Sequence, residues 1–169
     1  MKAPRNTAIT PITFNWTAWS SSVVNSTTAV ANTGDNGNYN GIVVDSNDNV
    51  HIVYYREDNA NLMYSTNASG SWQTTTVESS NNVGKYCNLA IDGNDGLHIS
   101  YQYNSGNALK YAYKSASSSS WTKTTVDNTG GKYTSIATDS NNNPHIAYRD
   151  SGGDVGYATK SSGASWTYG

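Results

Sequence analysis

The stretch Asp92-Gly-Asn-Asp-Gly-Leu-His98 occurs three times in closely similar form. Its copies, Asp45-Ser-Asn-Asp-Asn-Val-His51 and Asp139-Ser-Asn-Asn-Asn-Pro-His145, begin 47 residues before it and 47 residues after it. The same spacing separates three tyrosines, Tyr39, Tyr86 and Tyr133. A period of this length is typical of solenoids, propellers and other repeat arrays, so the repeat decides the fold class.

Each period reads as four short strands separated by turns. In the second period, these strands are the apolar and aromatic runs 86–92, 98–103, 109–113 and 121–126. Clusters of Gly, Asn and Ser, which form turns, lie between the runs, and no segment shows the periodicity of a helix. Four strands in one period of this length match one blade of a β-propeller. The sequence therefore predicts an all-β protein built of four-stranded propeller blades.

Three blades are expected in the chain, and the last of them lacks most of its fourth strand. These blades are 39–85, 86–132 and 133–169. Ahead of them, Trp19–Asn25 repeats the pattern of the fourth strands that begin at Trp72 and Trp121. We therefore expect an N-terminal arm at 1–18, followed at 19–38 by a leftover fourth strand and a linker that closes the ring.

Three blades are fewer than the roughly 4–8 blades of a closed propeller. Two chains that meet head to tail would supply six blades, and a head-to-tail contact that closes by rotation gives a ring. We therefore predict a homodimer that forms one six-bladed ring, in which Trp19–Asn25 of each chain pairs with the third blade of its partner. An additional strand within residues 8–18 would instead give a seven-bladed ring.

The repeated pattern resembles the blades of bacterial lectin and sialidase-like propellers. The likeness lies in an apolar-Ala-apolar-Asp-Ser-Asn run, a following Pro-His-Ile-Ala-Tyr run and a later Ser-Trp pair. It covers residues 39–169 and is strongest over 133–160. The resemblance implies the propeller fold, but it implies no particular activity because propellers serve as enzymes, lectins and scaffolds.

The composition favours an uncharged polar surface and a core rich in aromatic residues. The chain has 13 Tyr and 5 Trp, and Trp72, Trp121 and Trp166 are expected to pack between blades. Only 13% of residues are charged, the net charge is −2, and the pI is near 5.8, which argues against a nucleic-acid partner. No run of about 18 apolar residues predicts a membrane span. The start of the chain does not resemble a signal peptide, yet the polar coat suggests an extracellular or virion-associated protein.

The repeated histidines and aspartates have a structural interpretation. Each of His51, His98 and His145 is expected to bind the neighbouring Asp or backbone within its own blade, because copies in separate blades cannot converge on one metal ion. The Asp-x-Asn turns resemble the first half of a calcium loop, but the position of the later bidentate Glu is taken by Arg56. We therefore expect hairpin turns here and no metal, with weak calcium binding as the alternative.

The sequence predicts no enzyme. The sialidase resemblance implies an arginine triad, yet the arginines are Arg5, Arg56 and Arg149, and the last two do not occupy equivalent blade positions. Glu57 and Glu78 are the only Glu residues. No spacing in the sequence indicates the two carboxylates, about 5–10 Å apart, that glycoside hydrolysis needs.

The residues that differ between blades are the candidates for recognition. They lie after the second strand of each blade and before the first, and these loops share one face of a propeller. Planar aromatic rings beside Asn, Asp, Arg and Lys suit a sugar. The candidate ligand-binding residues are Tyr55, Arg56, Asp58, Lys85, Gln102, Tyr103, Asn104, Lys132, Arg149 and Asp150.

These observations favour a non-enzymatic, lectin-like, carbohydrate-binding propeller that acts without a cofactor. A homo-oligomer would repeat each site and gain avidity for a glycan. The alternative is a structural or protein-interaction half-propeller without a small-molecule ligand.

Overall fold

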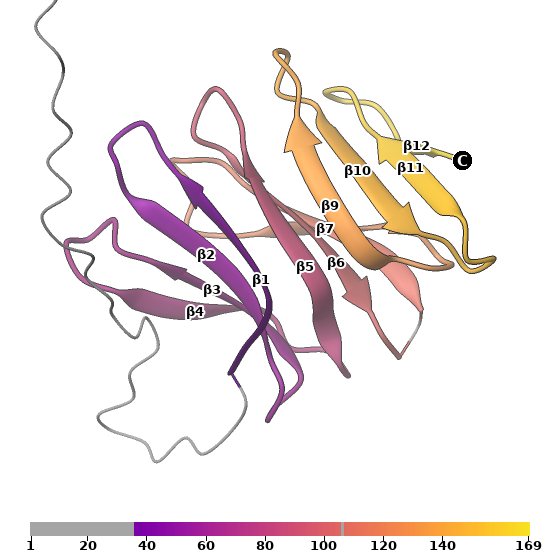
Figure 1. Ribbon diagram of the computed structural model, residues 1–169. Coiled ribbons are helices and arrows are strands. Elements are labelled where there is room, and N and C mark those ends of the chain that lie inside the picture. Colours follow the sequence, from indigo (N-terminus) through magenta and orange to yellow (C-terminus); the bar gives the residue numbers. More distant parts are fainter. Residues whose placement is uncertain (1–35, 106) are drawn as a thin grey trace, which may run out of the picture.

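The computed structural model describes residues 36–105 and 107–169, and these residues form three antiparallel sheets of four strands each (Figure 1). The first sheet, blade 1, contains β1 (Asn36–Val44), β2 (Val50–Arg56), β3 (Asn61–Thr66) and β4 (Gln73–Glu78). The second sheet, blade 2, contains β5 (Val83–Ile91), β6 (Leu97–Tyr103), β7 (Ala108–Lys114) and β8 (Thr122–Asp127). The third sheet, blade 3, contains β9 (Lys132–Thr138), β10 (Pro144–Arg149), β11 (Val155–Thr159) and β12 (Thr167–Tyr168).

The sheets lie in a row, with blade 2 between blades 1 and 3 (Figure 1). Within each sheet the strands follow one another in chain order, and the first strands β1, β5 and β9 lie side by side. This arrangement confirms the all-β prediction and is consistent with propeller blades. The predicted arm at 1–18 and the leftover strand Trp19–Asn25 lie outside the described residues, so the six-bladed ring stays a prediction.

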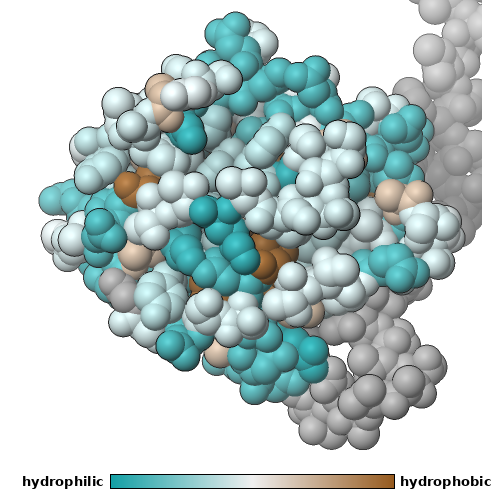
Figure 2. All heavy atoms as spheres, turned by 180° about the vertical axis from the view of Figure 1, so that it is seen from behind, coloured by the Kyte–Doolittle hydropathy of each residue, from teal (hydrophilic) through white to brown (hydrophobic). Residues whose placement is uncertain are grey.

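The surface of the protein is polar, and the described residues include no candidate membrane-spanning helix. Seen from behind, the surface is mostly hydrophilic or intermediate in hydropathy, as expected for a coat of Ser, Thr, Asn and Gly (Figure 2). Within residues 36–105 and 107–169, the structure has no helix of the length and hydropathy that crosses a membrane.

The repeated Asp-x-Asn segments form the hairpin turn between the first two strands of each blade. In blade 2, the Oδ1 atom of Asp92 accepts hydrogen bonds from the amides of Asn94 (2.8 Å) and Gly96 (2.7 Å). Asp95 has a φ of 59°, a left-handed conformation that Asp and Asn tolerate better than most residues. The prediction of turns at these segments is therefore confirmed.

The hydrophobic core lies between neighbouring blades rather than inside any one of them. One buried cluster joins blades 1 and 2 around Leu62 and Ile99, and a second joins blades 2 and 3 around Leu109 and Ile146. All four side chains have no exposed area. A single sheet would leave this apolar surface in water, so each blade is stabilised by its neighbour.

Aromatic pairs extend both junctions toward the outer strands. Trp121 of blade 2 packs edge-on against Tyr64 of blade 1, with ring centroids 5.4 Å apart. Trp166 of blade 3 packs in the same way on Tyr111 of blade 2, at 4.9 Å. The prediction that tryptophans pack between blades is confirmed for these two residues.

Two glycines set how closely the blades approach. A Cβ atom on Gly84 would lie 2.7 Å from Cβ of Leu62, and one on Gly131 would lie 2.7 Å from Cα of Leu109. Both glycines also have positive φ angles, of 107° and 87°. No other residue fits here without moving the neighbouring blade.

We predict that Gly84→Ala strongly destabilises the fold. The substitution costs about 1–2 kcal/mol for the left-handed backbone and about 1–3 kcal/mol more for the overlap with Leu62. Gly70→Ala is the matched control, because Gly70 has a φ of 82° but open space around it. Urea unfolding checks the prediction, and equal losses in both variants would contradict it.

Candidate functional site

The structure brings four of the predicted ligand-binding residues together at the end of blade 1. Arg56 donates two hydrogen bonds to the carboxylate of Asp58, at 2.7 and 3.0 Å. The amino group of Lys85 lies 5.3 Å from the ring centre of Tyr55 and 4.0 Å from a carboxylate oxygen of Glu57. These residues pair with one another on the face predicted from the sequence.

Two predicted residues, however, are buried and hold loops in place. Tyr55 is 1% exposed, and its hydroxyl donates to the side-chain oxygen of Asn82 at 2.8 Å. Gln102 has no exposed area, and its amide donates to the side-chain oxygen of Asn107 at 3.1 Å. Their side chains serve the packing of this face.

The other predicted residues are more accessible. Tyr103 is half-buried beneath the amino group of Lys110, which lies 5.7 Å from the ring centre. The Asp150 carboxylate accepts hydrogen bonds from the amides of the loop that follows it. Asn104, Lys132 and Arg149 complete the set, and a ligand site on this face stays a prediction.

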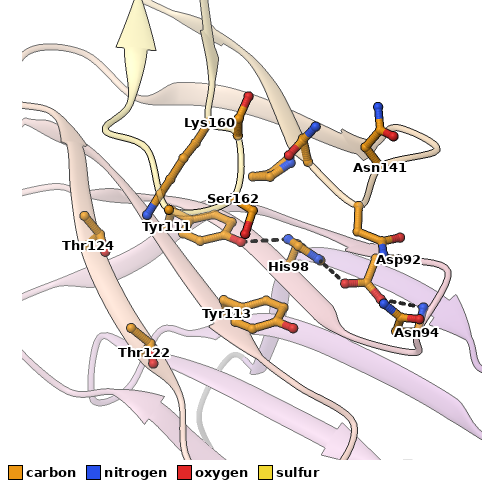
Figure 3. A pocket seen from close by; sticks show the side chains of 15 residues that line it. Asp92, Asn94, His98, Tyr111, Tyr113, Thr122, Thr124, Asn141, Lys160 and Ser162 are labelled. Carbon is orange, nitrogen blue, oxygen red and sulfur yellow. Dashed lines mark hydrogen bonds and ion pairs between the residues drawn. The ribbon is translucent and has the colours of Figure 1, made fainter.

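A distinct cavity of about 400 Å³ lies between blades 2 and 3, at the opposite ends of the strands (Figure 3). One wall comes from blade 2, through β7, β8 and the turn between β5 and β6. The other wall comes from blade 3, through the turn between β9 and β10 and the loop between β11 and β12. The lining residues are Asp92, Asn94, His98, Tyr111, Tyr113, Thr122, Thr124, Asn141, Asn142, Asn143, Pro144, Lys160, Ser161, Ser162 and Gly163.

A chain of hydrogen bonds forms the base of the cavity (Figure 3). His98 Nε2 lies 3.0 Å from the Asp92 carboxylate, and His98 Nδ1 lies 2.7 Å from the Tyr111 hydroxyl. Because a carboxylate only accepts hydrogen bonds, Nε2 carries the proton and Nδ1 of the neutral ring accepts from Tyr111. The arrangement therefore fixes the orientation of all three side chains.

Burial sets the protonation state of this chain. It lowers the pKa of His98 below its ordinary value of 6.5, although the Asp92 carboxylate acts in the opposite direction. Burial alone would raise the pKa of Asp92, but hydrogen bonds from His98 and the turn amides outweigh it and lower this pKa. Burial also raises the pKa of Tyr111. Near pH 7, His98 is therefore neutral, Asp92 is charged and Tyr111 is protonated.

The same Asp–His–Tyr chain is present in blade 1, and its His–Tyr half is present in blade 3. His51 lies 3.2 Å from Asp45 and 2.6 Å from the Tyr64 hydroxyl. In blade 3, His145 Nδ1 lies 2.6 Å from the Tyr157 hydroxyl, but Nε2 lies 3.4 Å from Asp139 and makes no hydrogen bond to it. The prediction that the histidine binds the Asp of its own blade is therefore confirmed for His51 and His98.

Tyr113 distinguishes this junction from the junction between blades 1 and 2. The corresponding residue is Thr66 in blade 1 and Thr159 in blade 3. The Tyr113 ring is half-buried, its centre lies 4.9 Å from that of His98, and burial raises its pKa. Sequence reasoning missed Tyr113, although a residue that breaks the repeat was a signal that could have identified it.

The cavity suits a polar ligand with one apolar face. On β7, half-buried Tyr113 offers aromatic surface beside the largely buried Tyr111, and Lys160 reaches over from blade 3 (Figure 3). Amide and hydroxyl groups of Asn, Ser and Thr residues surround this surface. Small-molecule sites commonly combine aromatic surface with a few placed polar groups in this way.

A scan of protein families and a search of curated proteins found no match to this sequence. Solved structures do match the fold. A mutant Aleuria aurantia lectin in complex with Fucα1-6GlcNAc matches with a TM-score of 0.58 and 17% identity, over 79% of this chain and 44% of that one. The Hadza microbial sialidase Hz136 matches with a TM-score of 0.56 and 11% identity, over 79% of this chain and 37% of that one.

A fucose lectin from Kordia zhangzhouensis, in complex with methyl-fucoside, matches with a TM-score of 0.51 and 14% identity. The match covers 77% of this chain and 96% of that one. By contrast, this chain spans less than half the length of the Aleuria lectin and of the Hadza sialidase. At these identities, the similarities show a lectin- and sialidase-like propeller fold and do not choose between binding and catalysis.

The buried histidine predicts a loss of stability in weak acid. The unfolded chain takes up a proton at His98 near pH 6.5, whereas the folded chain does so only at lower pH, so stability falls as the pH drops below about 6.5. Urea midpoints at pH 7.5 and 5.5 measure this fall. We expect a smaller fall in His98→Gln, and an unchanged fall would contradict the assignment.

Proposed function

We propose that this protein binds carbohydrate without converting it, and that the sugar occupies the cavity between blades 2 and 3. The observation that carries the proposal is the lining of this cavity, where the half-buried ring of Tyr113 lies among the amide and hydroxyl groups of Asn, Ser and Thr residues. A sugar presents the matching chemistry, because its C–H face packs on an aromatic ring and its hydroxyls both donate and accept hydrogen bonds.

The polar groups of the cavity come from both blades. Asn94 and Thr122 belong to blade 2, and Asn141 and Ser162 belong to blade 3 (Figure 3). Asn supplies both a donor and an acceptor, and a hydroxyl can act as either. Hydrogen bonds from both blades would hold the ligand in one orientation, which supports selectivity for one sugar.

The charges in the cavity favour binding over hydrolysis. Asp92 is the one carboxylate among the residues that line it. Its oxygens already accept hydrogen bonds from His98, Asn94 and Gly96. Glycoside hydrolysis ordinarily uses two carboxylates placed on either side of the bond that breaks. The cavity does not offer this pair.

The solved structures give the proposal a specific first ligand. The Kordia protein, of which this chain covers 96%, is a fucose lectin in complex with methyl-fucoside. Fucose also occurs in the ligand of the Aleuria lectin. We therefore name a fucoside as the first sugar to test, with the cavity as its site.

The functional unit in this proposal is a homodimer. Two chains form one six-bladed ring, and Trp19–Asn25 of each chain completes the third blade of its partner. Each ring then has two copies of the cavity, and a branched glycan that reaches both binds with avidity. The opposite face, which carries the accessible residues predicted from the sequence, is the alternative location for the sugar.

A structural or protein-interaction half-propeller is the second candidate function. The observation that favours it is the exposure of large apolar side chains at both ends of the row of blades, with Ile42 62% exposed and Val155 86% exposed. Exposed apolar surface of this kind commonly marks a protein–protein contact. This candidate needs no sugar.

A glycan array followed by calorimetry with methyl-fucoside tests the proposal. We expect Tyr113→Thr, which installs the residue that blades 1 and 3 have at this position, to weaken binding about two- to tenfold, since aromatic packing contributes about 0.5–1.5 kcal/mol. Half-buried Tyr103 lies on the opposite face, so Tyr103→Ala is the control and should bind normally.

If Tyr103→Ala weakens binding and Tyr113→Thr does not, the sugar binds on the face predicted from the sequence. Turnover of a fluorogenic glycoside would contradict the non-enzymatic assignment. A silent array from a correctly folded protein would favour the structural module.

A further inference from the structure

The two ends of the row of blades carry the two halves of an internal junction. We call the outer side of blade 1 the leading face, defined by Gly37, Ile42 and Val44. We call the outer side of blade 3 the trailing face, defined by Val155 and Tyr157. Each of these residues has counterparts at the same repeat position in the other blades. Those counterparts contact a neighbouring blade within the described residues.

The leading face is shaped to receive a blade. Gly37 has a φ of 95°, like its counterparts Gly84 and Gly131, yet a Cβ atom on Gly37 would meet no atom within 4 Å. Ile42 is 62% exposed, whereas its counterparts Leu89 and Ile136 are 5% and 7% exposed. The backbone conformation for a close contact is therefore present without the contact.

The trailing face is shaped to enter such a site. Val155 corresponds to Leu62 and Leu109, the residues that lie against Gly84 and Gly131, and it is 86% exposed where they are fully buried. Tyr157 is 49% exposed, while its counterpart Tyr111 is 7% exposed beneath Trp166. The tryptophan that would cover Tyr157 is absent from the described part of this face.

A buried hydroxyl on the leading side gives an independent indication. Tyr54 is 4% exposed, and its hydroxyl has no hydrogen-bond partner among residues 36–105 and 107–169. Its counterpart Tyr101 donates to Glu78 of the preceding blade at 2.6 Å. In blade 3, Tyr148 donates to Asp127 of the preceding blade at 2.7 Å. A buried hydroxyl without a partner is costly, so Tyr54 is placed for an acceptor from a preceding blade.

Polar contacts define the register of the internal junctions. The amide of Ser46 donates to the side chain of Asp95 at 3.0 Å, and the amide of Gly93 donates to that of Asn142 at 2.9 Å. Both contacts run from one turn to the corresponding turn of the next blade. The equivalent donor in blade 3 is the amide of Ser140, which lies two periods after Ser46. The equivalent acceptor in a blade 1 that follows blade 3 is Asp48, which lies one period before Asp95.

We propose that the trailing face of one copy docks on the leading face of a second copy in the register of the internal junctions. Val155 lies against Gly37 of the partner subunit, and Tyr157 packs under Trp72 of the partner subunit. The amide of Ser140 donates to Asp48 of the partner subunit. The inference rests on the homodimer of the proposed function and deepens it by assigning its contacts.

The partner is a second copy because the two faces complement each other. The chain contains two internal junctions between blades. The leading face has the glycine and apolar positions of one side of such a junction, and the trailing face has the apolar and aromatic positions of the other side. A head-to-tail contact uses both faces of both copies and closes into a ring after two chains, which leaves neither face exposed. A partner of another sequence would have to reproduce the same set of contacts.

Sedimentation equilibrium of the full chain tests the proposal. We expect the wild type at twice the chain mass of 18.1 kDa. Val155→Asp places a charge at the contact but at an exposed position of the chain, so it should keep the β-sheet circular dichroism and weaken dimerisation at least tenfold. Gly37→Ala should do the same. Ser119→Asp, in an exposed loop, and Gly70→Ala, at another positive φ with open space, are the controls and should remain dimeric.

A cysteine pair tests the register directly. Oxidation of Asp48→Cys/Ser140→Cys should give a covalent dimer on a non-reducing gel. The matched pair Ser46→Cys/Asp95→Cys occupies the same two repeat positions within one chain and should close without joining chains. A wild-type mass of 18.1 kDa, or a dimer that both Val155→Asp and Gly37→Ala leave intact, would overturn the proposal.

Sugar binding separates this failure from that of the proposed function. The cavity lies between two blades of one chain, so monomeric Val155→Asp should still bind methyl-fucoside. If the wild type is monomeric and binds the sugar, the docking is wrong and the binding function stands. If the wild type is dimeric and binds no sugar, the docking stands and the binding function is wrong.

Discussion

The close contact between a glycine of one blade and a leucine of the preceding blade is the constraint on which the structure depends. At Gly84 and Gly131 the backbone lies so near Leu62 and Leu109 that no Cβ atom fits. This approach buries the apolar side chains of both blades and brings the tryptophans onto the neighbouring tyrosines. Because each sheet has little core of its own, the junctions supply most of the hydrophobic stabilisation.

The Asp–His–Tyr chain connects this packing to the candidate site. In blade 2, Asp92 organises a tight turn through two amides and also orients His98, which in turn holds the hydroxyl of Tyr111. The turn and the tyrosine therefore have fixed positions before any ligand arrives. A preorganised wall loses less conformational freedom on binding, which raises affinity for a given set of contacts. In the proposed function, the same three residues thus serve both stability and recognition.

Much of the fold could be predicted from the sequence, because the repeat copies every feature that builds a blade. Turn residues, strand lengths and the tryptophan at each fourth strand recur at a fixed spacing, and the strands follow from them. The cavity could not be predicted in this way, since its walls belong to different periods and meet only after the blades pack. Tyr113 was missed although it breaks the repeat, because its place in the wall of a cavity emerges only from the packing of two blades. Tyr55 and Gln102 differ between blades as binding residues often do, but their burial depends on neighbouring loops that no single period reveals.

A crystal structure of the protein grown with methyl-fucoside tests the central claim most directly. We predict electron density for the sugar between blades 2 and 3, with its apolar face against Tyr113 and its hydroxyls within hydrogen-bond distance of Asn141. Density for the sugar on the loops around Arg56 and Tyr103, with the cavity filled only by solvent, would contradict the account.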